Sequence, residues 1–75
     1  MKVVLKCEST DARRALKYLY GVEIAVLKIK KYGLPLFEKF KITICVDNYR
    51  SLSRVMYRLN EECLNEVVVV KVKDE

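Results

Sequence analysis

The chain contains no histidine, no tryptophan and no glutamine, and its 75 residues include only one proline, two glycines and three cysteines. Without histidine it lacks the commonest metal ligand and the commonest general base. Cys7, Cys45 and Cys63 stand far apart with no C-x-x-C pair, and an odd number does not suit a secreted disulfide framework. We therefore expect no metal and no cofactor.

Catalysis without a metal needs a nucleophile beside a base or a pair of carboxylates, in a cleft that a domain of this size has little room to form. The sequence offers no such group, so we expect no enzymatic activity. Glu8 and Asp11 precede or begin a predicted helix and are expected to be cap and helix-dipole partners. Cys45 is expected to be a half-buried small hydrophobe. Cys7 and Cys63 should point inward, and a reducing compartment disfavours a disulfide between them.

Long apolar runs are missing as well. No stretch approaches the about 20 apolar residues of a membrane span, and residues 1–6 are too short and too interrupted by lysine for a signal peptide. These observations predict a cytoplasmic protein with no membrane partner. The absence of Gln and Trp, with many Lys, Glu and Val, resembles the composition of proteins from hot environments.

The length predicts a single domain over residues 1–75. A domain this short buries only about 60% of its unfolded surface, so its stability margin is thin. Small domains commonly gain additional stability from disulfides, a metal or a partner subunit. The composition of this chain disfavours disulfides and a metal. The net charge of +5 attracts polyanions but also suits an ordinary soluble surface.

Hydrophobic periodicity predicts four strands and two helices. In chain order we expect a strand at 2–7, a helix at 10–20 ending at a Gly21 cap, strands at 22–31 and 36–46, a helix capped by Asp47 or Asn48, and a strand at 67–72. Apolar residues on both faces of 22–31 predict a strand that is at least partly buried on both sides. The order matches the ferredoxin-like βαββαβ arrangement, an α+β fold with two helices on one face of a four-stranded antiparallel sheet.

In this arrangement the strands at 22–31 and 67–72 form the two edges of the sheet. Both are unusually apolar, and exposed apolar edges aggregate unless something covers them. We therefore expect a homodimer or a complex with another protein. The expected interface residues are Val22, Ile24, Ala25, Leu27, Ile29, Val67 and Val69.

Nucleic-acid binding is the main alternative, because basic residues line both predicted helices. These residues are Arg13, Arg14 and Lys17 on the first helix and Arg50, Arg54 and Arg58 on the second. RNA-binding domains of this fold stack bases on aromatic side chains of the two central strands, and the open-face positions expected on those strands include none. The arginines therefore either follow phosphates or form a solvated face with partners such as Glu62 for Arg58.

Residues 42–48, 52–56, 58–60 and 67–70, and more loosely 21–24, resemble the ACT domain found at the carboxyl end of RelA/SpoT alarmone enzymes. ACT domains pair into larger sheets, bind amino acids at the junction and regulate attached enzymes. The resemblance implies an assembly module with a small regulatory ligand at the first strand-to-helix turn. In this sequence that turn consists of Glu8, Ser9, Thr10 and Asp11.

The ligand-binding turn of ACT domains usually carries Asp followed by Pro-Gly, so that bare backbone approaches the ligand. Residues 8–12 contain neither proline nor glycine. The chain also resembles, more weakly, the small dimerising subunits of the KEOPS tRNA-modification complex, in length and in the strand-helix-hairpin-helix order. That second resemblance implies an accessory subunit of a nucleic-acid-processing complex.

Overall fold

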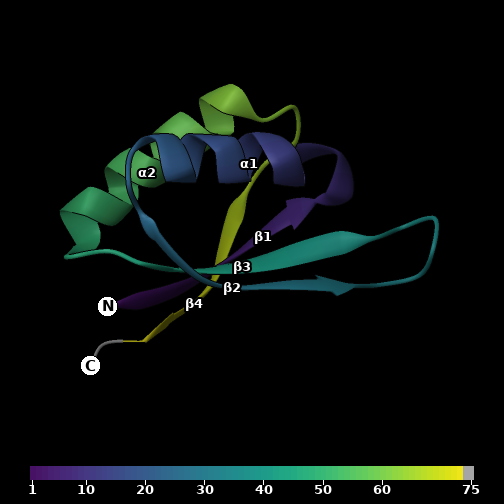
Figure 1. The fold of residues 1–75 in the computed structure, drawn as a ribbon, viewed down its shortest axis with the longest axis horizontal. Coiled ribbons are helices and arrows are strands. Elements are labelled where there is room, and N and C mark those ends of the chain that lie inside the picture. Colours follow the sequence, from purple (N-terminus) through teal and green to yellow (C-terminus); the bar gives the residue numbers. More distant parts are fainter. Residues whose placement is uncertain (74–75) are drawn as a thin grey trace.

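A computed structural model describes residues 1–73 and contains the six expected elements in the expected order. They are β1 (Lys2–Glu8), α1 (Ser9–Gly21), β2 (Ala25–Tyr32), β3 (Lys39–Cys45), α2 (Tyr49–Glu62) and β4 (Val68–Lys73). Both helices lie on one face of a single sheet (Figure 1). The protein therefore has the predicted α+β, ferredoxin-like fold.

The sheet has the strand order β2-β3-β1-β4, and every neighbouring pair is antiparallel. The predicted central strands, β1 and β3, and the predicted edges, β2 and β4, are thus confirmed. Two irregularities shift the register, one between Val26 and Lys28 of β2 and one in β4 opposite Val4 and Leu5. Each changes which side chains of an edge strand share a face with the central strands.

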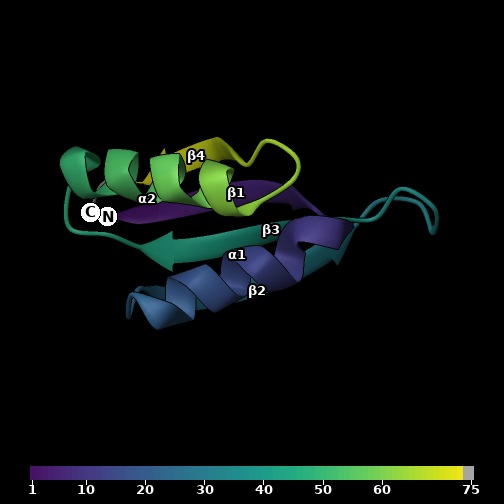
Figure 2. The ribbon, with the colours of Figure 1, turned by 90° about the horizontal axis from the view of Figure 1, so that it is seen from above.

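The hydrophobic core lies between the helices and one face of the sheet. The helices lie side by side over that face, as the view from above shows (Figure 2). The largest buried side chains of the core are Val3, Leu5, Leu19, Ile42, Ile44 and Leu59. Ala12 and Ala15 let α1 approach the sheet closely, and the buried residues of α2 are Leu52, Val55 and Leu59. In the described chain no layer covers the opposite face of the sheet.

The end of α1 differs from the prediction. Gly21 was expected to cap the helix, but the helix continues through it, and the left-handed residue is Glu23, with φ of 59°. The Glu23 N–H donates to the Tyr20 carbonyl and the Ile24 N–H to the Leu19 carbonyl, which is the bonding of a Schellman motif. This motif occupies residues 22–24, so β2 begins at Ala25 rather than at Val22.

The prediction that the second strand is buried on both sides is wrong. As an edge strand with no neighbour on its outer side, β2 leaves Leu27 50% exposed and Ile29 43% exposed. The third strand also starts later than predicted, because residues 34–37 form a turn in which the Phe37 N–H donates to the Leu34 carbonyl. Leu34, Leu36 and Phe37 are exposed at the tip of this hairpin, which extends beyond the helices (Figure 1).

Asn48 caps α2, as predicted, by accepting a hydrogen bond from the Ser51 N–H at 2.9 Å. No helix among residues 1–73 has the length and apolar character needed to cross a membrane.

Candidate functional site

The residues expected to bind a ligand, 8–11, form the end of β1 and the first turn of α1, which is organised around Asp11. Its side chain is fully buried, and its two oxygens accept hydrogen bonds from the Leu64 N–H, the Asn65 N–H and the Asn65 side-chain amide, at 2.9–3.0 Å. The carboxylate therefore ties the first turn of α1 to the loop between α2 and β4. Glu8 occupies the N-cap position without a side-chain capping bond, and it instead lies 3.8 Å from the Lys39 ammonium. Ser9 and Thr10 are exposed.

Asp11 is an ionised group in a buried place. Burial by itself raises the pKa of its carboxyl, but the hydrogen bonds from Leu64 and Asn65 and the nearby Arg14 guanidinium outweigh burial and hold that pKa below the ordinary 3.8. The side chain is thus charged at neutral pH and has all its acceptors engaged inside the protein. We refer to Asp11 with Leu64 and Asn65 as the Asp11 clasp.

The cysteines differ in exposure. Burial, followed by the nearby Cys63 and Asp11, raises the pKa of the Cys7 thiol to about 11, and burial also raises the pKa of the Cys63 thiol. Both are therefore protonated, weak nucleophiles at neutral pH. Cys45 is exposed, not half-buried as predicted, because it ends β3 on the uncovered face of the sheet. All three thiols are free.

The expected interface residues do not form one surface. Val67 is only 2% exposed and belongs to the core, so its assignment to an interface was wrong; its N–H is held by the Asn60 side chain, which turns it inward. Ile24 packs against the core. Val22, Ala25, Leu27 and Ile29 are exposed along or beside β2, whereas the exposed Val69 lies on β4 at the opposite edge.

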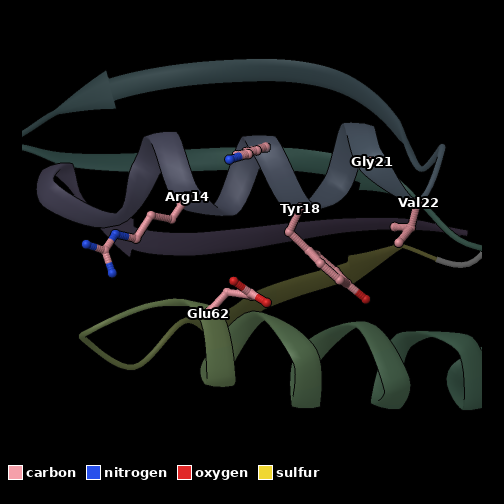
Figure 3. Close-up of a pocket in the computed structure, with 6 residues that line it drawn as sticks. Arg14, Tyr18, Gly21, Val22 and Glu62 are labelled. Atoms are coloured by element: carbon pink, nitrogen blue, oxygen red, sulfur yellow. The ribbon is translucent and has the colours of Figure 1, made fainter.

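The basic residues expected to contact nucleic acid are all exposed, but they lie on two separate helices. A groove of about 410 Å³ runs between these helices and is lined by Arg14, Lys17, Tyr18, Gly21, Val22 and Glu62. Tyr18 and Glu62 point into it (Figure 3). Arg58 pairs with Glu61 at 3.4 Å and not with Glu62, the partner expected from i,i+4 spacing. Carboxylates thus interrupt the basic surface of the helices.

A second basic surface covers the open face of the sheet. Lys2, Lys6 and Lys41 were expected on this face, as found, but a basic surface there was not predicted. Side chains that share a face with Lys41 and Thr43 can be read from the strand register. We call the lysines on this side the lysine face; they are Lys2, Lys6, Lys28, Lys30, Lys39, Lys41, Lys71 and Lys73. Eight of the ten lysines of the chain therefore lie on one side of one sheet. Among residues 1–73, Glu8 is the one acidic residue in the strands, and it lies on the same side.

The register arranges these residues in rows that cross the sheet. One row reads Lys28, Thr43, Val4 and Lys71, and the next reads Lys30, Lys41, Lys6 and Val68. At the centre lies a hollow of about 240 Å³, which we call the central hollow; it is lined by Val4, Lys28, Lys30, Lys41, Thr43, Val70 and Lys71. The open-face positions of the two central strands hold no aromatic residue, as expected. Tyr32, which was expected in the hairpin connection, instead ends the edge strand β2 on this face. It stands opposite Lys39, and the Lys41 ammonium lies 4.9 Å from its ring centre.

Neither a scan against protein-family models nor a search of the curated proteins gives a match to this chain. Among residues 1–73, no group of three or more Cys, Asp or Glu side chains is placed to hold a metal ion. The fold and the site thus define a small α+β domain with a strongly basic open sheet. The resemblances to the ACT domain and to the KEOPS small subunits remain predictions.

Proposed function

We propose that this protein is a binding module whose lysine face holds the phosphate backbone of a nucleic acid. The observation that carries the proposal is that, among residues 1–73, the strands place eight lysines and one carboxylate, that of Glu8, on the uncovered face of the sheet. A basic surface gathered on one face of a domain is the electrostatic feature of nucleic-acid-binding proteins. Basic residues scattered for solubility would instead alternate with acidic ones.

The arrangement of the lysines strengthens this interpretation. Lys41 stands directly between Lys6 on β1 and Lys30 on β2. Neighbouring strands are only about 4.8 Å apart, so like charges directly opposite each other destabilise the sheet. A polyanion laid across these rows relieves that repulsion, which gives binding a favourable contribution beyond simple attraction.

The apolar side chains of the lysine face favour a nucleic acid over a membrane surface as its ligand. Peripheral membrane proteins insert large apolar side chains among their basic residues. The most exposed leucines are Leu36 on the hairpin tip and Leu64 in the loop between α2 and β4, and both lie outside the strands that carry the lysines. The apolar groups around the central hollow are small or β-branched, such as Val4 and Val70, and Tyr32 lies at the hairpin end of the same face.

The test is the salt dependence of oligonucleotide binding, measured by fluorescence anisotropy. If about five phosphates are engaged, the affinity for a single strand should fall roughly a hundredfold between about 50 and 200 mM salt, because each contact releases condensed counterions. Binding that is independent of salt, or no binding at the lowest salt, would refute the proposal.

Self-association or docking to another protein is a second candidate function, favoured by the exposed apolar side chains of the unpaired edge β2. Leu27 and Ile29 are about half exposed there, and Val22 lies just before the strand. Lys28, Lys30 and Lys31 alternate with them, and lysines on an edge oppose uncontrolled pairing. Light scattering at tens of micromolar should show a dimer that Ile29→Lys reverts to a monomer, and a wild-type monomer would exclude self-association.

A further inference from the structure

The central hollow combines two kinds of surface. Its floor is formed by Val4 and Thr43, which are directly opposite each other on the two central strands, together with Val70 of β4. Lys28 and Lys71 bound it on the two edge strands, and Lys30 and Lys41 bound it on the side toward the hairpin. An apolar floor with a cationic rim matches a ligand that carries a flat apolar ring and an attached phosphate.

The hydrocarbon stems of the rim lysines add to the apolar walls, because lysine buries its methylene groups and keeps its ammonium in water. Thr43 contributes a methyl group and a hydroxyl, and a hydroxyl can donate to or accept from the edge of a base. The hollow is thus equipped to take an uncharged ring at its centre while the ammonium groups around it contact phosphates. Simple phosphate binding would leave the floor unused.

The two forms of nucleic acid present these groups differently. In a duplex the bases are stacked inside and the phosphates lie on a convex surface, so the floor of a shallow hollow between lysines stays empty. In a single strand the bases can be splayed out against the protein while the backbone follows the basic groove. An open sheet face with a hollow at its centre therefore favours the single strand.

We infer that the ligand of the lysine face is a single-stranded nucleic acid with one unpaired base seated in the central hollow. This inference rests on the proposed function and adds the strandedness of the ligand and the place of the base. The base is held by contact with Val4, Thr43 and Val70, and the phosphates on either side of it are held by the rim lysines. Tyr32, beside Lys41 at the end of β2, extends the surface available to a neighbouring base.

Three oligonucleotides test the inference at one fixed low salt concentration: a single strand, the same strand with every base removed, and the corresponding duplex. The single strand should bind about tenfold more tightly than the abasic strand, since stacking a base contributes about 1–3 kcal/mol. It should also bind more tightly than the duplex. Equal binding of the single and abasic strands, or tighter binding of the duplex, overturns the inference and leaves the proposed function intact.

A pair of conservative variants locates the base. Val4→Thr keeps the shape and β-propensity of the floor but makes it polar, and it should reduce the affinity for the single strand severalfold without changing the affinity for the abasic strand. Val68→Thr is the matched control, because Val68 lies on the same face outside the hollow. Equal effects of the two variants would contradict seating in the hollow.

Failure of all three oligonucleotides to bind would overturn the proposed function as well as this inference. Preferential binding to vesicles of anionic lipid would do the same.

Discussion

The double substitution Lys41→Glu, Lys71→Glu should lower the affinity for a single-stranded oligonucleotide by about a hundredfold at low salt. Both lysines border the central hollow, and the exchange removes two cations and adds two anions beside the bound backbone. Anisotropy titrations should also show a flatter salt dependence, with a slope smaller by about one to two, because two counterion-releasing contacts are lost.

A matched control separates this effect from net charge. The double substitution Arg50→Glu, Arg54→Glu makes the same charge change on the exposed face of α2. It should weaken binding by less than about threefold, because long-range attraction is screened over about 10 Å. If this control weakens binding as much as the lysine variant, the phosphates contact the helix arginines rather than the sheet.

Stability provides a second control for the lysine variant. A glutamate at position 41 stands between Lys6 and Lys30 and replaces repulsion across the sheet by attraction. The loss of the Lys41 contact with the Tyr32 ring offsets part of this gain. The melting temperature should therefore stay constant or rise while binding falls, which excludes unfolding as the cause of lost affinity.

The substitution Asp11→Asn should destabilise the protein by about 3 kcal/mol. The asparagine keeps the size of the side chain but offers one acceptor oxygen in place of two, and its amide group faces the donors of residues 64 and 65. For a domain of this size the loss corresponds to a melting temperature lower by roughly 10–20 °C. Urea unfolding followed by circular dichroism measures it directly.

Asp47→Asn is the control for this prediction, because Asp47 is an exposed carboxylate close to a helix start. It should change the unfolding free energy by less than about 0.5 kcal/mol. A loss in Asp11→Asn no larger than in the control would mean that the clasp contributes nothing to stability.

The pH dependence of unfolding gives an independent check. The pKa of Asp11 is lower in the folded protein than its ordinary value of 3.8 in the unfolded chain. Its contribution to stability is therefore present above that ordinary value and is lost as the pH falls through the folded pKa. The wild type should lose more stability than Asp11→Asn between about pH 5 and pH 2, and parallel curves for the two proteins would contradict this account.

The parts of the fold that were predictable from the sequence are those set by local periodicity. Val3, Leu5 and Cys7 alternate along β1, and Leu52, Val55 and Leu59 recur along α2, so the buried face of each element follows from its own residues. The element order then leaves few topologies, because an antiparallel sheet with two helices on one face buries all these stripes together.

The lysine face was not predictable in the same way. Lys28 and Lys30 lie on its β2 side only because the register shifts between Val26 and Lys28, which frees Ile29 from the alternation of the preceding residues. Nothing in a two-residue period signals such a shift. The available signal was the alternation of lysines at 28 and 30, 39 and 41, and 71 and 73. The apolar residues between these lysines instead led to the prediction of an interface at the sheet edges.

The role of Asp11 depends on partners distant in the chain. A carboxylate in the first turn of a helix predicts an interaction with that helix, whereas the groups it binds belong to Leu64 and Asn65. The end of α1 shows the opposite difficulty, because the local signal of Gly21 was present but the turn closes two residues later, at Glu23. There the packing of Ile24 on the core fixes the geometry.

The Asp11 clasp also sets an order of events in folding. It joins residues more than fifty positions apart in the chain. The strand β4, which pairs with β1, follows directly after this long loop. The loss of chain entropy is incurred before these contacts form, which places the clasp and the docking of β4 late on the folding pathway. Until residues 64–73 are free to fold, α1 lacks the hydrogen bonds of the clasp and β1 remains unpaired on its β4 side.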